Sequence, residues 1–598
     1  MPTFAPAYLE RMKYLRSIRL WAIATLAFAG VSCKPDRIVE KTVSVTGVAV
    51  SPVTASLEIG ETLQLTAAVS PADAIVKDVE WTSNNDAAAT VNAKGLVTAV
   101  AAGNASITVT TRDGGYSARS RITVKSKDDP QPQPEPEPEP QPQPKTTRTW
   151  EDTGAGVPRY PTYNPVSDIS DFPRIDITWE QETQRLAEGE YTWVDGTVRF
   201  RDPKGMYKDD DDTAYETDSQ VLQMRIRGRG NTSYDAEGGI KHSYKIKLAE
   251  HRKVFGMKGD KDWILLADVQ DPSLLRNAVA LRISRLVSMP WTPKYRAVEV
   301  YFNGNYGGCY LLVEGKEADR ENKIPITVVG PGETDGGYLL EIDNKGDYDR
   351  YFRTETFQKK IKFKDPEFGD RLNPDNSADA VAQMEYITGY VNEVERLLKE
   401  RAFDPETGYQ SKLDLYTFIG NYIVQELTMN VDGGMRLSTY FAKDKDTKLF
   451  MPMVWDFDLA LGNCSYIGSD FNLSPGMDGP EGWFIKIRGG SFENGDWDGS
   501  QKSYYQYLFE DPLFVAALKE RWNLVKPRLD MIPDFIDKMA EYNKPAYDHN
   551  VTAGKNPRAA RNYYYPPDNY NSWSEAVAYM KDFYTRRLAW LDTEINKL

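Results

Sequence analysis

The chain has 598 residues and a formal net charge of -15 at neutral pH. This length is too great for one small domain and sufficient for two or three domains with substantial cores. The acidic balance argues against nucleic-acid binding, which needs a basic surface, and three histidines are too few for a histidine-based zinc or catalytic cluster.

Residues 1–33 have the pattern of a bacterial export signal. Basic residues precede an apolar run, 20–31, that is shorter than the roughly 20 residues needed to cross a bilayer. The run ends in AGVSC and resembles a lipobox, although Gly30 stands where Leu is usual. The resemblance predicts an exported lipoprotein at the cell surface or outer membrane, anchored through lipidated Cys33. An ordinary cleaved signal is the alternative.

The segment 44–125 has strand-like alternation of apolar and polar residues, as in Leu63, Leu65 and Ala67, broken by the turn signals SPADA, NAKG and RDGG. This pattern predicts an antiparallel β-sandwich with Trp81 in its core. The phrases LEIGETLQLTAAVSP and VEWTSNNDAAATVNAKGLVTAVAAGNASITVT resemble the bacterial Ig-like domain of group 2. The resemblance implies a spacer or adhesive module.

A linker at 126–147 contains PQPQPEPEPEPQPQP, residues 130–144. Alternating proline fixes φ and removes backbone donors, so we expect an extended polyproline II rod at about 3.1 Å per residue. In an exported protein a stiff spacer is favoured over a ligand for a peptide-binding domain. The linker separates a stalk from a head at 148–598.

The head mixes strand-like runs, such as VLQMRIRG and GGCYLLVEG, with helix-like runs, such as SLLRNAVALRISRLV. Strands dominate its first half and helices its second half. The last segment begins with Ser572 and Glu575 in the spacing of a capping box and then carries an apolar face. The head is therefore predicted to be an α+β domain with a sheet-rich lobe and a helix-rich lobe.

A basic cluster begins at RIRGRGNTS, residues 225–233. Glycines let backbone N–H groups approach an anion, and Arg227 and Arg229 add bidentate donors. On the next strand Lys245 and Lys247 lie on one face because they are two residues apart. The cluster is interpreted either as a phosphate cradle or as a tight hairpin with surface arginines.

Three aspartates form an acidic group that could act together with the basic cluster. Asp432 follows a helix-like stretch in a glycine-rich loop, whereas Asp456 and Asp458 follow the apolar run 450–455, which is predicted as a buried strand. Carboxylates there are costly unless paired or metal-bound. Phosphotransferases use such a spacing, with the first carboxylate orienting a hydroxyl and the second holding Mg²⁺. A structural aspartate network is the alternative.

Other polar residues fall at the ends of apolar strands. Glu314 and Glu341 are expected to be partners for a lysine, walls of a pocket, or simply solvated carboxylates. Cys309 and Cys464 either form a disulfide in an oxidising compartment or remain separate buried thiols.

Taken together, these phrases resemble the CotH family of spore-coat protein kinases over about 170–598. The matching phrases occur in the family's order: RGRGNTS, SYKIKL, DWILLADVQDPSLLRNAVALRIS, VEVYFNGNYGGCYLLVE, GGYLLEID, MNVDGG and MVWDFDLALGN. The resemblance implies an atypical protein-kinase-like fold that binds ATP and Mg²⁺ and phosphorylates Ser or Thr of an unidentified protein.

The resemblance also implies roles for single residues. Asp432 would be the catalytic-loop aspartate, Asp456 the metal-binding aspartate, and Asp458 a second carboxylate at the metal. The side chains implied to face ATP are basic: Arg227, Arg229, and Lys245 or Lys247.

One departure bears on activity. Family members carry Asn shortly after the catalytic Asp, where this chain has Ser438 and Thr439. An Asn carbonyl is a usual Mg²⁺ ligand in kinases, and a hydroxyl is a weaker substitute. A non-catalytic surface adhesin that contacts cell-wall glycans or proteins is therefore the second hypothesis. A glycoside hydrolase with two carboxylates is a third, less favoured one.

Overall fold

The chain divides into two compact units, Met1–Gln141 and Pro142–Leu598. Within them the computed structural model describes residues 44–125, 165–180, 192–207, 215–230, 241–316, 318, 323–343, 349–369, 373–463, 479–487, 491–493, 496–498, 502–555 and 572–598. The predicted signal with Cys33, the linker 126–147 and Cys464 lie outside these residues. Across the described ranges no helix is both long enough and apolar enough to cross a membrane.

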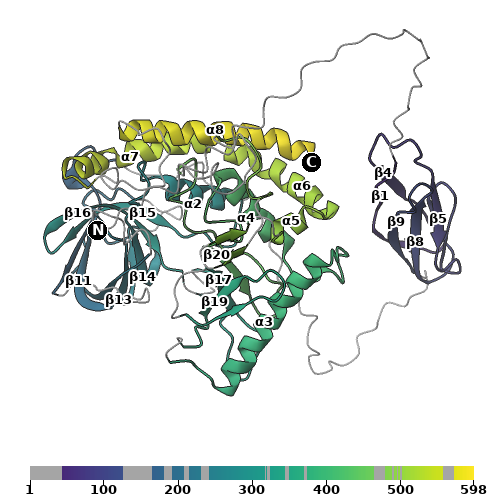
Figure 1. Cartoon of the computed structure of the whole chain (residues 1–598), viewed down its shortest axis with the longest axis horizontal. Helices are drawn as coiled ribbons and strands as arrows, with labels where there is room; N and C mark the ends of the chain where they lie inside the picture. The colour runs from purple at the N-terminus through teal and green to yellow at the C-terminus, as the bar shows by residue number, and fades with distance from the viewer. Residues whose placement is uncertain are drawn as a thin grey trace, which may run out of the picture. The chain divides into compact units, whose positions relative to one another are not determined.

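The first unit is the predicted β-sandwich (Figure 1, purple). Its ladders are β2-β9-β8-β5, β3-β7-β6 and β1-β4. The strands are β1 Gly47–Ser51, β2 Thr54–Glu58, β3 Thr62–Gln64, β4 Thr66–Ser70, β5 Val79–Ser83, β6 Ala89–Val91, β7 Leu96–Ala99, β8 Gly103–Thr111 and β9 Ser117–Lys125. Trp81 is partly buried and packs against the core. Gly95 is required beside it, because a Cβ there would lie 2.9 Å from the Trp81 ring and φ is +79°.

The second unit begins with a closed barrel of order β10-β11-β12-β13-β14-β16-β15. Its strands are β10 Arg174–Trp179, β11 Val194–Arg201, β12 Leu222–Gly228, β13 Tyr244–Val254, β14 Met257–Leu266, β15 Tyr295–Phe302 and β16 Asn305–Glu314. β10 and β15 close it as a parallel pair, with Ile175 opposite Val300. Alternate residues such as Ile226, Ile246 and Trp263 are buried, so their sequence neighbours face outward.

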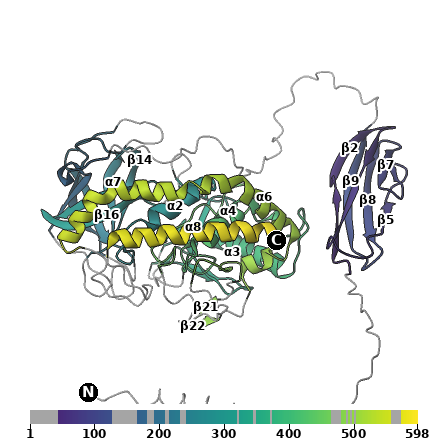
Figure 2. The same cartoon turned by 90° about the horizontal axis from the view of Figure 1, so that it is seen from above.

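The remainder of the unit is built around the sheet β18-β19-β17-β20 and a set of helices. The bounds are η1 Ile169–Asp171, α2 Arg276–Leu286, β17 Tyr338–Ile342, β18 Tyr351–Arg353, β19 Lys360–Asp365, α3 Ala378–Lys399, η2 Tyr409–Ser411, α4 Leu415–Thr428, β20 Thr439–Lys443, β21 Ser491–Glu493, β22 Asp496–Asp498, α5 Tyr504–Leu508, α6 Pro512–Leu529, α7 Ile532–Thr552 and α8 Trp573–Lys597. Helices α7 and α8 run side by side (Figures 1 and 2), and α7 also contacts β15 and β16. The α+β prediction for the head is therefore confirmed.

The C-terminal helix forms as its sequence pattern predicts. The Ser572 hydroxyl accepts a hydrogen bond from the Glu575 amide at 3.2 Å, which caps the first turn of α8. The apolar face is buried: Val577, Met580, Tyr584, Leu588, Leu591 and Ile595.

A buried ion pair joins α8 to α4. Arg587 and Glu426 are 0% and 1% exposed, and Arg587 Nη2 lies 2.5 Å from Glu426 Oε1. Glu426 also accepts hydrogen bonds from the Phe484 amide at 2.6 Å and the Lys486 amide at 2.8 Å. Because α4 leads directly into the loop of Asp432, this pair fixes the end of the helix that positions that loop.

Replacing Arg587 by Met should lower the free energy of unfolding of the second unit by about 3–5 kcal/mol, because Glu426 would stay buried without its partner. Urea unfolding followed by tryptophan fluorescence measures the loss. Arg586 is the matched control, since its pair with Asp582 is exposed and Arg586→Met should cost less than about 0.5 kcal/mol. Equal losses in the two variants would refute the importance assigned to the buried pair.

Candidate functional site

The loop of Asp432 is set by the end of α4. The helix stops at Met429, whose φ of +46° is left-handed, and the chain then turns back into β20. A Cβ at Gly433 would lie 1.9 Å from Gln425 Oε1, so a larger residue there would have to displace the end of that side chain. The Asp432 side chain is 22% exposed, and its Oδ1 lies 3.6 Å from Arg436 Nη1. Asp432 therefore presents a carboxylate that solvent and an incoming substrate can reach.

Asp456 and Asp458 lie on a loop that follows a buried segment. The prediction of a strand at 450–455 is wrong: the residues are buried and extended, but they form only the isolated bridge Ala442↔Phe450. At its end Asp456 adopts a left-handed φ of +69°. Its Oδ2 accepts a hydrogen bond from the Ser438 hydroxyl at 3.1 Å. The two predicted acidic loops are thus in direct contact.

Two further aspartates extend this carboxylate cluster. Asp268 and Asp271 follow β14 and are buried, whereas Asp456 and Asp458 keep partial access to solvent. Burial, followed by repulsion from Asp271, raises the pKa of Asp268 to about 7. Sequence reasoning quoted the phrase DWILLADVQDPSLLRN that holds these two residues but assigned them no role.

The pKa values of Asp456 and Asp458 in this cluster are also raised. Burial raises the pKa of Asp456, and repulsion from Asp432 adds to the effect. The pKa of Asp458 lies well above its usual range because of burial and of repulsion from Asp456 and Asp432. An excess of enclosed carboxylate is the electrostatic condition that favours binding of a cation.

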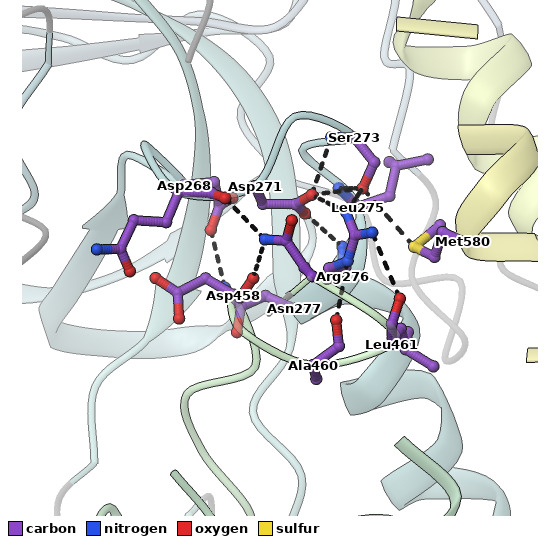
Figure 3. A network of polar contacts seen from close by, with 12 residues as sticks. Asp268, Asp271, Ser273, Leu275, Arg276, Asn277, Asp458, Ala460, Leu461 and Met580 are labelled. Carbon is purple, nitrogen blue, oxygen red and sulfur yellow. Dashed lines mark hydrogen bonds and ion pairs between the residues drawn. The ribbon is translucent and has the colours of Figure 1, made fainter. Parts of the chain in front are cut away.

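A buried ion pair holds the loop after Asp458 against α2 (Figure 3). Arg276 Nη1 lies 2.5 Å from Asp271 Oδ1, and both side chains are 0% exposed. The same guanidinium donates to the carbonyls of Ala460, at 2.9 Å, and Leu461, at 3.4 Å. The first turn of α2 therefore fixes the backbone that follows the WDFD phrase.

Two cationic side chains, Arg229 and Lys316, act on the Asp456 carboxylate. The Arg229 guanidinium lies 5.6 Å from the centre of the Trp455 ring, and Lys316 Nζ lies 4.5 Å from the same ring. Lys316 Nζ is also 3.9 Å from Glu341 Oε1 and donates a hydrogen bond to the Tyr440 hydroxyl. Burial lowers the pKa of Lys316 to about 8, against the opposing attraction of Glu341.

Glu341 is the anchor of this basic group. Burial alone would raise its pKa, but Lys316, Lys364 and Lys362 outweigh burial and lower the pKa to about 2. Glu341 therefore stays ionised and holds Lys316 beside Trp455. Of the alternatives open for Glu341 from sequence, the structure selects the lysine partner. Sequence reasoning missed Lys316 itself, whose only local signal is its place two residues after β16.

The other predicted basic residues lie along the outward face of β12 and β13. Arg227 stacks on Trp193 at 5.1 Å. Lys245 and Lys247 lie 3.1 and 3.6 Å from opposite oxygens of Asp262. Arg227 faces Lys245 across the two strands. Among the four basic residues predicted to face ATP, the electrostatic contact with Asp456 is thus made by Arg229.

The donor set fits a hard divalent cation. Asp456, Asp458 and the Ser438 hydroxyl offer the oxygen ligands that Mg²⁺ prefers. In the part of the chain that the structure describes, no group of three or more His, Cys, Asp or Glu side chains is placed so that it could hold a metal ion. Protein Mg²⁺ sites commonly use one or two carboxylates and complete the octahedron with water and phosphate oxygens, so the arrangement is consistent with this ion.

Cys309, the described member of the second cysteine pair, carries a free buried thiol.

Comparisons with known proteins match the two units to two different families. The profile of the CotH kinase protein family matches residues 225–591, more than half of the chain, and that of the bacterial Ig-like domain (group 2) matches residues 44–122. An α-L-arabinofuranosidase of Bifidobacterium longum subsp. longum is 46% identical over 65 residues, 11% of this chain and 6% of that protein. An Ig-like virion protein of Serratia phage KSP90 is 45% identical over 83 residues, 14% of this chain and 32% of that protein.

The matches to solved structures are remote. Domains 4 and 5 of the S-layer protein SbsC align with a TM-score of 0.12 and 22% identity, covering 13% of this chain and 51% of that structure. The chain spans only 6% and 32% of the length of the two curated relatives above. The similarity to these proteins is therefore limited to one short segment. The family profile begins within β12 and covers the barrel strands after it, the carboxylate cluster and α8 as far as Leu591. The chain therefore belongs to the CotH kinase protein family and carries a bacterial Ig-like domain of group 2 ahead of the family's domain.

Proposed function

We propose that the second unit transfers a phosphoryl group from ATP to a Ser or Thr hydroxyl of another protein, with Mg²⁺ bound beside Asp456. The observation that carries the proposal is the convergence of Asp432, Asp456 and Asp458 opposite Arg229 and Lys316. Phosphoryl transfer needs positioning and charge stabilisation more than covalent chemistry, and this site supplies both signs of charge.

Each side chain then has a distinct task. Asp432 accepts a hydrogen bond from the substrate hydroxyl, orients its oxygen for in-line attack and takes up its proton as the oxygen attacks. Asp456 and Asp458 hold the metal ion, which when bound would neutralise charge on the transferred phosphoryl group. Arg229 and Lys316 bind phosphate oxygens from the barrel side.

Arg227 and Lys245 are proposed to support this phosphate site. They face each other across β12 and β13, and like charges placed opposite each other are unfavourable in a sheet. Asp262, 3.1 Å from Lys245, already offsets part of that repulsion. Lys247, which pairs with the same carboxylate as Lys245, extends the basic face.

Asp432→Ala and Asp456→Ala should each reduce transfer of radiolabelled phosphate from ATP by at least about 10³-fold, since each removes one indispensable part of the site. Autophosphorylation of the purified chain with Mg²⁺ provides the assay. Asp444 is a buried aspartate that bonds to the Thr327 amide at 3.1 Å and lies outside the cluster; Asp444→Asn is the control for folding. Unchanged transfer in both alanine variants would exclude the proposed roles.

Nucleotide affinity should fall as the pH rises through about 8, because the free protein loses the Lys316 charge there. Lys316→Arg should flatten this dependence between pH 7 and about 9.5, since a guanidinium keeps its proton above pH 12. Isothermal titration with the Mg²⁺ complex of a non-hydrolysable ATP analogue measures both profiles. Parallel profiles for the two proteins would show that Lys316 does not bind the phosphates.

We also propose that the chain is exported and anchored through lipidated Cys33, with the Ig-like domain and the Pro-rich linker as spacers. The Ig-like domain supports a place at the cell surface. Cys33→Ala should remove incorporation of an alkyne-labelled fatty acid and shift the protein from the membrane fraction to the soluble fraction. Labelling that persists in the Cys33→Ala protein would contradict the anchor.

A further inference from the structure

Three buried asparagines converge on the backbone of Asp456, Phe457 and Asp458. They come from separate parts of the chain: Asn277 from the first turn of α2, Asn430 from the end of α4, and Asn463 from the loop after Leu461. None of them was singled out by the sequence patterns. Each uses its carboxamide to bind a backbone group of the metal-binding phrase or of its neighbours.

Two of the three bind the same peptide group. Asn430 Nδ2 donates to the carbonyl of Asp456 at 3.0 Å, and the amide of Phe457 donates to Asn277 Oδ1 at 2.9 Å. This carbonyl and this amide belong to one planar peptide unit and point in opposite directions. The plane is therefore held from both sides.

The orientation of each carboxamide is itself fixed by its second partner. Asn277 Nδ2 donates to Asp268 Oδ1 at 2.8 Å (Figure 3). Asn430 Oδ1 accepts from the Asp432 amide at 3.3 Å. If either carboxamide were flipped, its oxygen would face another oxygen and its NH2 group would face an N–H donor. The donors and acceptors can therefore be assigned.

The peptide needs such a lock because Asp456 is left-handed, with φ at +69°. The plane of the 456–457 peptide sets the ψ angle of Asp456 and the φ angle of Phe457. At a φ of +69° only a narrow range of ψ is allowed for a residue with a side chain, so rotation of this plane would strain Asp456 and force the loop to rearrange. Asn463 Nδ2 donates to the carbonyl of Asp458 at 2.6 Å, two residues further along. The asparagines thus bind the backbone on both sides of Phe457.

We propose that Asn277 and Asn430 are positioning residues that lock the peptide between Asp456 and Phe457, and that Asp268 acts through Asn277 to hold this peptide and with it the ψ angle of the metal-binding Asp456. The inference rests on the proposed function for the role of the metal, but the lock itself is a property of the backbone. It makes the start of α2 part of the catalytic machinery, since a shift of that helix would release the peptide.

A swap of two side chains tests the lock. In Asn277→Asp the new carboxylate still accepts from the Phe457 amide but faces the Asp268 carboxylate, so repulsion breaks the contact. In the double variant Asp268→Asn/Asn277→Asp, the amide at 268 donates to the carboxylate at 277, and both hydrogen bonds and the total charge are restored. Asp268→Asn alone should cause a smaller loss than Asn277→Asp.

Two measurements on the full chain show whether each variant keeps the lock. Hydrogen exchange of the Phe457 amide should accelerate at least about 10-fold in Asn277→Asp, and the affinity for Mn²⁺ alone should fall about 10-fold or more, as for other outer-shell partners of metal ligands. Both values should return to within about threefold of the wild type in the double variant. Asn430→Asp should match Asn277→Asp in both measurements.

Asn421 provides the matched control, since it is a buried asparagine of α4 whose Oδ1 accepts from the Tyr505 hydroxyl at 2.8 Å. Asn421→Asp buries a new carboxylate without touching the 456–457 peptide and should leave Mn²⁺ affinity unchanged. The lock is refuted if Asn421→Asp weakens Mn²⁺ as much as Asn277→Asp, or if the double variant remains as impaired as the single one. A wild type that binds no Mn²⁺ would overturn the metal role, while amide exchange still decides the lock.

Discussion

The arrangement of the second unit depends on how it compensates buried charge. An ion enclosed in protein needs a partner and hydrogen bonds to replace its water. Arg587 with Glu426 and Arg276 with Asp271 meet this requirement, since each pair is fully buried and each arginine also donates to backbone carbonyls. The cluster around Asp456 does not, because several carboxylates there keep raised pKa values despite the nearby cations. These carboxyls are therefore the groups that the proposed cation would stabilise in their ionised form.

The two compensated pairs hold the uncompensated site in shape. Arg587 fixes Glu426 near the end of α4, and the chain then leads through Asn430 to Asp432. Arg276 fixes the carbonyls that follow Asp458. A left-handed aspartate costs on the order of 1–3 kcal/mol, and contacts of this kind from both flanks are what allow Asp456 to retain that conformation. Stability and site geometry are thus properties of the same buried network.

The sequence predicted the features that depend on local pattern. The alternation of apolar and polar residues predicted the β-sandwich, and the spacing of Ser572 and Glu575 predicted the helix cap. The two acidic loops were predicted because one follows a helix-like stretch and the other follows the apolar run 450–455. The run 450–455 was predicted wrongly as a strand because periodicity cannot show whether a ladder partner exists. Lys316, Asp268 and Asn277 were missed since their roles arise only when β14, β16 and α2 meet the WDFD loop. The shared outward face of Lys245 and Lys247 was predictable, but their partner Asp262 was not.

Ser438, which stands where the family resemblance implies an asparagine, affects the charge balance of the site as well as its ligands. An asparagine carbonyl at this position would offer another acceptor beside Asp456. The Ser438 hydroxyl instead donates to Asp456 Oδ2 at 3.1 Å, and a donor to a carboxylate lowers its pKa. This bond opposes the rise that burial and Asp432 cause at Asp456. Ser438 therefore favours the ionised form of the carboxylate that a metal requires, while its oxygen keeps a lone pair for the ion. The hydroxyl is a weaker ligand than an amide carbonyl, but its hydrogen bond favours the ionised form of Asp456, so Ser438 fits the proposed metal site.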